Sequence, residues 1–302
     1  MDAIILENVN KSFGSNYVVK NLSVRCPEQT IYGFLGPNGA GKTTTLRMIM
    51  SILCPDSGNI LICSRNFQQV SREKIGYLPE ERGLYQKMTV QGILSYIAAI
   101  KGVKRKLSHE VVRWMDTFGL IGLEKHKVEE LSKGMQQKLQ FITTVINEPD
   151  ILIFDEPFSG LDPINVELIA NIMIRLKKSG KTIIYSTHVM EQAEKLCDFI
   201  LLLDKGEKIF DGPYEQLKSY YKNNIIYLKL DGDASFLNRL PIIKIIEQSD
   251  GEVKVKLNKN VEPQELLAKL SSKVKIKGFE IKSPALHEIF IDMVGNNNVQ
   301  NY

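Results

Sequence analysis

Short apolar runs alternate with amphipathic helical stretches over roughly the first 212 residues of the chain. Strand-length apolar runs occur at residues 29–35, 150–155, 181–187 and 198–203. Continuous runs of this kind are typical of strands that are buried on both faces of a sheet. Helices are expected at residues 42–52, 132–147, 163–178 and 189–196. The alternation predicts an α/β fold.

Two further regions depart from this alternation. Residues 84–131 carry helical patterns without a convincing strand, which predicts a helical subdomain inserted into the sheet. Beyond about residue 220 the expected order becomes β-α-β-β-α-β, at 224–230, 234–240, 241–248, 252–258, 263–271 and 273–281. That order is typical of a small ferredoxin-like α+β domain. A last helix is expected at 283–294, with Ser283 as its cap and Pro284 at its first position. We therefore expect domains at 1–220 and 221–295 and a disordered tail at 296–302.

Composition narrows the class of protein without naming a partner. The net charge of +4 is small against 39 basic and 35 acidic residues, so it does not indicate nucleic acid or lipid as a ligand. The four cysteines form no CxxC pair and no zinc spacing, which favours reduced thiols. The first residues lack the pattern of a signal peptide, and the apolar runs are too short to cross a bilayer. Any work at a membrane is therefore expected to need separate membrane polypeptides.

Residues 36–43 read Gly-Pro-Asn-Gly-Ala-Gly-Lys-Thr and lie between a predicted strand and a predicted helix. Glycines in such a loop let backbone N–H groups converge on phosphates, and the helix N-terminus adds a positive dipole. Lys42 can neutralise charge between the phosphates, and the Thr43 hydroxyl can ligate Mg²⁺. The alternative, a chance glycine-rich turn, does not explain why every fixed position is present. The candidate phosphate-binding residues are Gly36, Pro37, Asn38, Gly39, Ala40, Gly41, Lys42, Thr43 and Thr44.

A second acidic element follows the apolar run at 150–155. Asp155 lies at the carboxyl end of the predicted strand, where open α/β sheets bind their ligands. Asp155 is the candidate for holding Mg²⁺, and the adjacent Glu156 is the candidate base for the attacking water. The alternative is a pair of solvated acids after a strand. With a phosphate loop upstream, the sequence favours the magnesium interpretation.

From about Ile4 to Gly212 the chain resembles the ATP-binding-cassette (ABC) ATPases. The resemblance is carried by "GPNGAGKT", "LSKGMQ", "ILIFDEP", "SGLD" and "STH", in this order and at family-like spacing. Each motif alone is weak, but five in order are specific. The resemblance implies a P-loop ABC ATPase core, with a mainly parallel sheet, an antiparallel β subdomain and an inserted helical subdomain, followed here by the small C-terminal α+β domain.

The resemblance also assigns roles to residues outside the phosphate loop. His188 resembles the switch histidine that contacts the γ-phosphate, and Asp162 belongs to a segment that resembles the D-loop. Phe13 lies where the family places an aromatic residue that stacks on adenine, with Tyr17 as a less favoured substitute. Core packing is the alternative for Phe13, because aromatic residues near strands are usually buried. A satisfied core histidine is likewise the alternative for His188.

Gly134 lies in the first turn of a predicted helix, where glycine weakens the helix. In the family, two such domains face each other head to tail, and each ATP lies between the phosphate loop of one and the signature of the other. The resemblance therefore implies that Ser132 and the Gly134 N–H meet the γ-phosphate of ATP bound to a second copy. Ser132 can also cap its own helix.

The chain departs from the family pattern in its signature, which reads Ser-Lys-Gly-Met rather than Ser-Gly-Gly-Gln, and at Glu80. Lys133 stands in the signature where the family carries glycine, and it adds a positive charge. Glu80 stands where the family carries a glutamine that touches Mg²⁺ and the attacking water, so Glu80 is a candidate metal ligand. The run "GYLPEERGLY" resembles bacterial exporters that include sodium-extrusion and drug- or peptide-resistance ATPases.

The resemblance implies an ATP-hydrolysing subunit of an exporter, with ATP and Mg²⁺ as cofactors and a second copy and separate transmembrane permease subunits as partners. It implies a peripheral position on the cytoplasmic face of the cell membrane. The alternatives are an importer ATPase and a soluble ABC ATPase that acts on ribosomes or nucleic acid. The single cassette, without a heptad run or zinc spacing, favours the transporter over the latter and predicts no nucleic-acid partner.

The C-terminal domain carries alternating lysines on its predicted strands. Lys254 and Lys256 share one face of their strand, and Val253 and Val255 share the other. Residues 273–277 repeat this pattern. The sequence leaves two interpretations open: a solvated face with edge-protecting lysines, or a docking surface for a second copy or an acidic partner. RNA binding is disfavoured because only Tyr227 offers an aromatic ring on that face.

Overall fold

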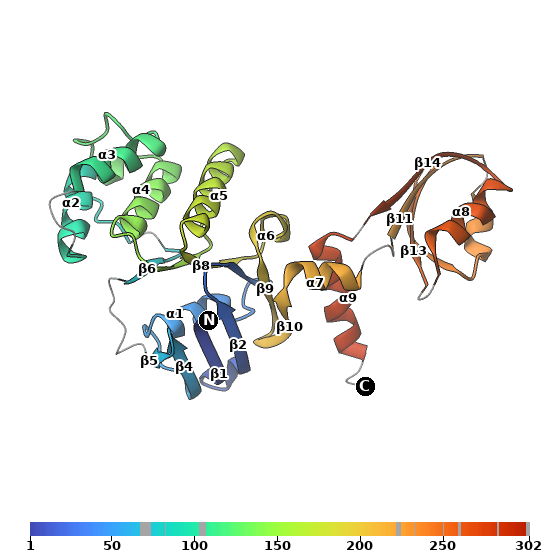
Figure 1. The fold of residues 1–302 in the computed structure, drawn as a ribbon, viewed down its shortest axis with the longest axis horizontal. Helices are drawn as coiled ribbons and strands as arrows, with labels where there is room; N and C mark the ends of the chain where they lie inside the picture. The colour runs from blue at the N-terminus through green and yellow to red at the C-terminus, as the bar shows by residue number, and fades with distance from the viewer. Residues whose placement is uncertain are drawn as a thin grey trace. The chain divides into compact units, whose positions relative to one another are not determined.

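The computed structural model describes residues 1–66, 74–81, 83–102, 107–221, 225–232, 234–249, 251–258, 261–282 and 284–299 (Figure 1). The chain divides into two compact units, Met1–Gly212 and Pro213–Tyr302. The division precedes α7 (Tyr214–Tyr220), which we expected in the first domain. Burial and the neighbouring Asp292 of the last helix raise the pKa of Tyr221, at the end of α7. This contact ties α7 to the second unit.

A six-stranded sheet forms the centre of the first unit, in the order β10-β9-β3-β8-β7-β6. Its strands are β3 (Ile31–Leu35), β6 (Ile75–Leu78), β7 (Ile151–Asp155), β8 (Thr182–Thr187), β9 (Phe199–Asp204) and β10 (Glu207–Pro213). The neighbours from β9 to β6 pair in parallel. Strands β3, β7 and β8 are buried along their whole length. Burial on both faces explains why these segments are continuous apolar runs in the sequence.

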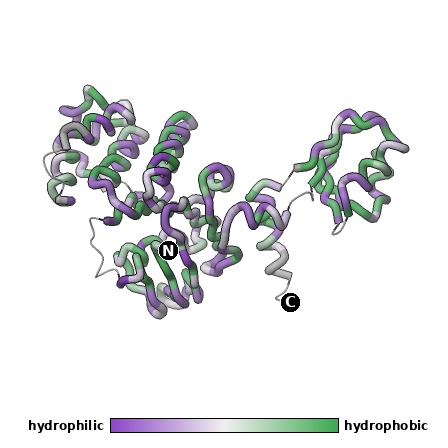
Figure 2. Tube along the Cα trace, in the orientation of Figure 1, coloured by the Kyte–Doolittle hydropathy of each residue, from purple (hydrophilic) through white to green (hydrophobic). Residues whose placement is uncertain are grey.

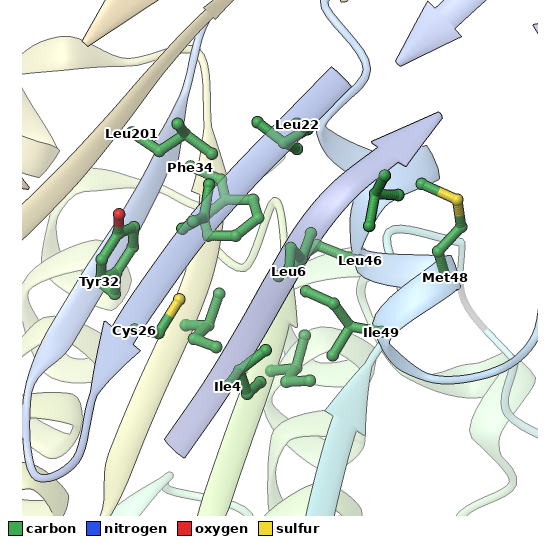
Figure 3. Close-up of a cluster of buried hydrophobic side chains, with 14 of the residues drawn as sticks. Ile4, Leu6, Leu22, Cys26, Tyr32, Phe34, Leu46, Met48, Ile49 and Leu201 are labelled. Atoms are coloured by element: carbon green, nitrogen blue, oxygen red, sulfur yellow. The ribbon is translucent and has the colours of Figure 1, made fainter. Parts of the chain in front are cut away.

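A four-stranded antiparallel sheet, β2-β1-β4-β5, lies beside the central sheet. Its strands are β1 (Asp2–Phe13), β2 (Asn16–Pro27), β4 (Ser57–Ile62) and β5 (Arg65–Asn66). Figure 3 shows Leu6 of β1, Leu22 of β2, Phe34 of β3 and Leu46 of helix α1 (Lys42–Ile49) in one buried cluster. The segment that joins β3 to α1 is therefore anchored in the core at both of its ends.

The helices of the first unit are α1 (Lys42–Ile49), α2 (Val90–Ile100), α3 (Leu107–Thr117), α4 (Lys133–Val145), α5 (Pro163–Lys178) and α6 (Met190–Leu196). Figure 1 shows α2, α3 and α4 gathered at one end of this unit. The described part of residues 84–131 contains α2, α3 and a 3-10 helix, Val128–Glu130, and no strand. The predicted α/β fold, with a parallel sheet, an antiparallel sheet and a group of helices, is confirmed.

The second unit contains an antiparallel sheet in the order β12-β13-β11-β14. Its elements are β11 (Ile225–Asp231), a 3-10 helix (Ser235–Arg239), β12 (Ile243–Ser249), β13 (Glu252–Leu257), α8 (Pro263–Ser271), β14 (Lys275–Lys282) and α9 (Leu286–Val299). This order is the ferredoxin-like one, except that the first helix is a single 3-10 turn. Hydrophobic and hydrophilic segments alternate along the elements of both units (Figure 2).

The lysine face of the second unit is partly covered by its own last helix. Lys254 forms an ion pair with Glu288 of α9, and Lys256 forms one with Asp292 at 3.2 Å. Val253 and Val255 are buried on the other face of β13, as the alternation predicted. Neither open interpretation describes this arrangement, because α9 supplies acidic partners from within the chain.

The expected tail is also different in the structure. Helix α9 ends at Val299, so it includes residues 296–299 of the expected tail. Once a helix has begun, each added residue contributes a backbone hydrogen bond, and no proline interrupts this segment. Residues 300–302 and the expected cap, Ser283, lie outside the described residues. All four cysteines are free, and no described helix has the length and apolar character needed to cross a membrane.

Candidate active site

The carboxyl ends of four central strands lie level with one another. The parallel register pairs Leu35 with Thr187, Asp155 with Ser186, and Leu78 with Phe154. The segments that leave these ends are the glycine-rich loop, the Asp155–Glu156 pair, the loop with His188 and the loop with Glu80. Since ends of parallel strands share one edge of a sheet, this edge collects the candidate residues.

The glycine-rich loop requires glycine at two of its positions. Gly36 has a φ of 153°, and a Cβ atom there would lie 2.2 Å from the carbonyl oxygen of Leu203. Gly41 has a φ of 98° and caps α1, and a Cβ atom would lie 2.5 Å from the carbonyl oxygen of Val18. A side chain at either position would displace the loop. Helix α1 therefore begins directly from a loop that presents its backbone, as a phosphate-binding loop must.

Lys42, the first residue of α1, is almost completely buried. Its Nζ donates to the carbonyl oxygens of Gly36 at 2.7 Å and Pro37 at 3.1 Å, and it lies 3.8 Å from Oε1 of Glu156. Burial lowers the pKa of Lys42, and the negative charges of Glu156, Asp155 and Glu80 act in the opposite direction. The ammonium group is thus fixed over the loop in a site that favours an additional anion.

Thr43 and Asp155 form the acidic side of the site. The Thr43 hydroxyl donates to Oδ1 of Asp155 at 3.0 Å, and the Ser186 hydroxyl donates to the same oxygen at 2.6 Å. The other carboxylate oxygen of Asp155, Oδ2, is buried and has no hydrogen-bond partner among the described residues. A buried carboxylate oxygen of this kind is suited to a cation or to a water bound to one.

Glu156 follows Asp155 in a left-handed conformation, with a φ of 49°. Its backbone N–H donates to the Ser186 hydroxyl at 2.9 Å, and its Oε1 lies 3.0 Å from Nδ1 of His188. Strained backbone of this kind persists where the surrounding structure holds it, often at functional sites. The His188 side chain is 51% exposed, so the core interpretation of this histidine is wrong.

Glu80 lies just beyond the end of β6 and is exposed. Its negative charge acts on Lys42 together with Glu156 and Asp155, so it belongs to the same electrostatic group. Gln140 of α4 contacts the carbonyl oxygens on both sides of Glu80. Sequence reasoning did not find Gln140, because an amide on a helix carries no local signal of its partners.

Phe13 ends β1 and is 51% exposed, so its interpretation as a core residue is wrong. Lys11 Nζ lies 5.5 Å from the centre of its ring. Tyr17 is also exposed and lies at the start of β2, where it pairs with Ser12 next to Phe13. The backbone carbonyl of Val18, on the same strand, packs against Gly41 of the glycine-rich loop. Both rings are thus exposed on a hairpin that lies against the glycine-rich loop.

Ser132, Gly134 and Asp162 lie at the starts of two other helices. The Ser132 hydroxyl caps α4 by accepting a hydrogen bond from the N–H of Met135, and Asp162 caps α5 by accepting one from Asn165. The Asn165 N–H also lowers the pKa of Asp162. Of the residues that the structure describes, a Cβ atom on Gly134 would meet Leu161 alone, at 3.7 Å. None of these described contacts reaches the glycine-rich loop.

The structure thus brings together Lys42, Thr43, Asp155, Glu156 and His188, with Glu80 at the rim. It places the signature and D-loop residues in a second group. Ser186 joins the two acidic residues and was not among the predicted site residues, although the "STH" segment contains it. Because the pairing of β7 with β8 places Ser186 beside Asp155, only the sheet register assigns it this role.

Comparison with known proteins supports the same description. The family description "ABC transporter" matches residues 19–159, and "ATP-binding protein DrrA1-3-like, C-terminal domain" matches residues 212–294. The chain is 44% identical over 294 residues to the uncharacterized ABC transporter ATP-binding protein YhaQ of Bacillus subtilis, covering 97% of this chain and 98% of that protein.

Two more distant similarities cover the cassette or the whole chain. The chain is 33% identical over 298 residues to a Nod factor export ATP-binding protein I of Burkholderia lata, covering 97% of each. A solved ATP-binding subunit of an ABC transporter is 26% identical, with a TM-score of 0.68, over 72% of this chain and 93% of that one. The chain belongs to the ABC transporter ATP-binding proteins, whose ATP-binding domain hydrolyses ATP.

Proposed function

We propose that this protein is the ATP-hydrolysing subunit of an exporter, and that it binds MgATP and drives separate permease subunits at the cytoplasmic face of the membrane. The observation that carries the proposal is the contact of Thr43 with Asp155 beside the buried Lys42. It combines a phosphate-binding cation with a metal-binding carboxylate at one strand edge. The exporter class is supported by the name of the Nod factor export relative.

The residues present fit Mg²⁺. Mg²⁺ prefers oxygen ligands and is usually held by one or two protein groups together with substrate phosphates. Thr43 and Asp155 offer a hydroxyl and a carboxylate, and the unpartnered Oδ2 of Asp155 is available. When bound, the ion neutralises charge on the phosphate oxygens. Ser186 keeps Asp155 in place by its hydrogen bond.

Glu156 and His188 are proposed to act on the attacking water and the γ-phosphate. Glu156 Oε1 lies near both Lys42 and His188, and these two side chains keep its carboxylate in place. The carboxylate can then accept a proton from the attacking water. His188 Nδ1 holds this carboxylate, and its exposed ring can reach the phosphate.

The first experiment is Glu156→Gln, which preserves shape and removes the base. ATP hydrolysis should fall by on the order of 10²–10⁴-fold, while ATP binding is retained and an ATP-bound dimer accumulates. Hydrolysis rates and light scattering in ATP measure this. Glu148→Gln is the matched control, because Glu148 is an exposed glutamate with a positive φ at the opposite end of β7. Wild-type hydrolysis by Glu156→Gln would contradict the base assignment.

We further propose that each ATP lies between two copies. Gly134 weakens the start of α4, yet the nearest atom that a Cβ there would meet in the described part of its own chain belongs to Leu161. The need for glycine therefore lies outside the single copy, and a phosphate on the second copy explains it. The exposed first turn of α4, with its cap and helix dipole, supports binding of an anion there.

Mixed dimers test this arrangement. Lys42→Met and Gly134→Val copies, each inactive alone, are combined under two different affinity tags. If the sites are shared, the mixed dimer contains one intact site, formed by the loop of the second copy and the signature of the first. Its ATPase activity should return to roughly half of wild type. If each copy formed its own site, mixing would restore nothing.

An exposed aromatic pair supports docking to a permease. Tyr85 and Tyr96 are 56% and 42% exposed, and their rings contact edge to face, 5.6 Å apart. Tyr85 follows the Glu80 loop and Tyr96 lies on α2. Exposed aromatic side chains of this kind are typical of protein interfaces.

Pull-down from detergent-solubilised membranes tests the partner. Polytopic membrane proteins should co-purify with the wild type, and Tyr85→Ala with Tyr96→Ala should reduce their recovery. Tyr220→Ala, an exposed tyrosine of the second unit, is the control. Recovery of ribosomes or DNA instead would favour the alternative, a soluble ABC ATPase.

A further inference from the structure

Gln140 is a buried polar residue in the middle of α4. Gln140 is only 4% exposed. Its Nε2 donates to the carbonyl oxygens of Pro79 at 3.4 Å and Glu81 at 3.3 Å. These two carbonyls flank Glu80 on the chain. The amide therefore holds the backbone on both sides of the acidic residue.

The choice of glutamine at this position is costly for folding. Burying an amide costs free energy unless hydrogen bonds replace those to water, and both of these bonds are long. Oε1 of Gln140 is also buried and has no hydrogen-bond partner among the described residues. An apolar side chain of the same size would fill the space without an unsatisfied oxygen. Folding alone does not explain the residue.

Helix α4 packs closely against β6, the strand that leads into the Glu80 loop. The Thr144 hydroxyl lies 3.5 Å from the carbonyl oxygen of Tyr77, and a Cβ atom on Gly76 would lie 2.9 Å from the Thr144 carbonyl oxygen. The glycine thus permits close packing of the helix on the strand. At the opposite end of α4 lies the signature, with Gly134 about 9 Å and Ser132 about 12 Å along the axis from Gln140.

We propose that Gln140 is a positioning residue that holds the Glu80 loop against α4, so that the Glu80 carboxylate is kept at the metal side of the nucleotide site. The inference rests on the proposed MgATP site. Asp155 supplies the first carboxylate of that side, and Glu80 supplies a second from the neighbouring strand end.

The test measures binding of Mn²⁺, as a probe for the metal, to the full chain in the presence of a non-hydrolysable ATP analogue. Electron paramagnetic resonance gives the free Mn²⁺. Gln140→Met should weaken Mn²⁺ binding roughly tenfold, because residues that position metal ligands typically have effects of this size. Gln140→Leu, which also lacks the donor, should show the same loss.

Gln216→Met is the control. Gln216 lies on α7 of the second unit, where its Nε2 donates to the Tyr220 hydroxyl at 3.1 Å. It belongs to none of the site segments, so the Mn²⁺ affinity of this variant should equal that of wild type. Melting temperatures of the variants, compared with wild type, show that each is folded.

A double substitution tests whether Gln140 affects Mn²⁺ binding through Glu80. If Gln140 acts through Glu80, then Gln140→Met added to Glu80→Gln should weaken Mn²⁺ binding no further than Glu80→Gln alone. Additive losses, or an unchanged Mn²⁺ affinity in folded Gln140→Met that still binds the analogue, overturn the inference and leave the proposed function intact. Failure of wild type to bind the analogue overturns both.

Discussion

At the residue scale, the Ser186 hydroxyl joins the two acidic residues of the site. It donates to Oδ1 of Asp155 and accepts the N–H of Glu156, so one oxygen fixes both a metal-side carboxylate and a strained backbone. All three residues are buried. Removal of the hydroxyl leaves a buried N–H without its partner and deprives the carboxylate of one of its two hydroxyl donors.

Ser186→Ala should therefore lower both stability and turnover. The free energy of unfolding should fall by about 1–3 kcal/mol because a buried donor loses its partner. ATP hydrolysis should fall roughly tenfold or more through loss of ligand orientation. Urea unfolding and steady-state hydrolysis measure the two effects. Ser179→Ala, whose exposed hydroxyl only caps the end of α5, should change neither. Full activity in Ser186→Ala would remove Ser186 from the site.

Gly134→Ala should separate folding from function. Among the described residues a Cβ atom there would meet only Leu161 at an ordinary 3.7 Å, and alanine favours a helix over glycine, so stability should be equal or up to about 1 kcal/mol higher. ATP-dependent dimerisation should nevertheless weaken. Thermal unfolding and light scattering in ATP are the measurements. Gly122→Ala is the contrasting control, since open space surrounds Gly122 but its φ of 88° disfavours alanine. It should lose stability and keep dimerisation.

At the scale of elements, α4 connects three parts of the first unit. Its first turn carries the signature, its middle contacts the Glu80 loop, and its last turn receives Lys101 from the end of α2. Lys101 Nζ donates to the carbonyl oxygens of Thr143 at 2.9 Å and Thr144 at 3.2 Å, and to Asn147 Oδ1 at 3.1 Å. A cation at this end also interacts favourably with the helix dipole.

The Lys101 contact should make stability depend on pH. Burial lowers the pKa of Lys101 to about 8 from 10.5. Between these two values the unfolded chain binds more protons than the folded one, so stability should rise with pH across that window. Below pH 8 both states are charged and this contribution is constant. The free energy of unfolding of wild type minus that of Lys101→Met, measured by urea titration from pH 7 to 10, should show this rise.

Lys87→Met serves as the control for the pH series. Lys87 is exposed on the same subdomain and pairs with Glu129 at 2.9 Å. The free energy of unfolding of wild type minus that of Lys87→Met should not rise with pH in this window. A flat difference for Lys101→Met between pH 8 and 10 would show that the ammonium remains charged in the folded state.

At the scale of the whole molecule, the chain consists of two units with separate cores. The core of the second unit includes Leu228, Val253, Val255, Leu266 and Leu270. The first unit contains all of the predicted site residues. The expected border, at residue 220, differs from the observed one because α7 joins the second unit through Tyr221 and Asp292.

Chains cut at the observed border should fold independently. A chain that ends at Gly212 should unfold cooperatively and bind an ATP analogue with roughly wild-type affinity, because no predicted site residue is lost. Residues 213–302 alone should show cooperative unfolding of their own. Circular dichroism during heating and analogue titration measure these outcomes. A chain ending at Gly212 that is unfolded would show that its core depends on the second unit.

The sequence alone determined the α/β class, the buried strands and the phosphate loop. These features have local causes: apolar runs of strand length, fixed glycines before a lysine, and acids at a strand end. It also placed α5 and α8 at their observed bounds, because proline at the first position and flanking turn residues mark helix starts. The family resemblance rested on motif order, which is likewise a property of sequence.

Only the tertiary structure decided which residues meet. The Ser186 contact depends on the pairing of β7 with β8, and the Gln140 contact on the packing of α4 against β6. It also showed Phe13 to be exposed and the lysines of β13 to be paired with α9. Such contacts join residues that are distant in the chain, so no local pattern of propensity or periodicity encodes them. Local pattern therefore specified the elements, and packing between elements specified the site.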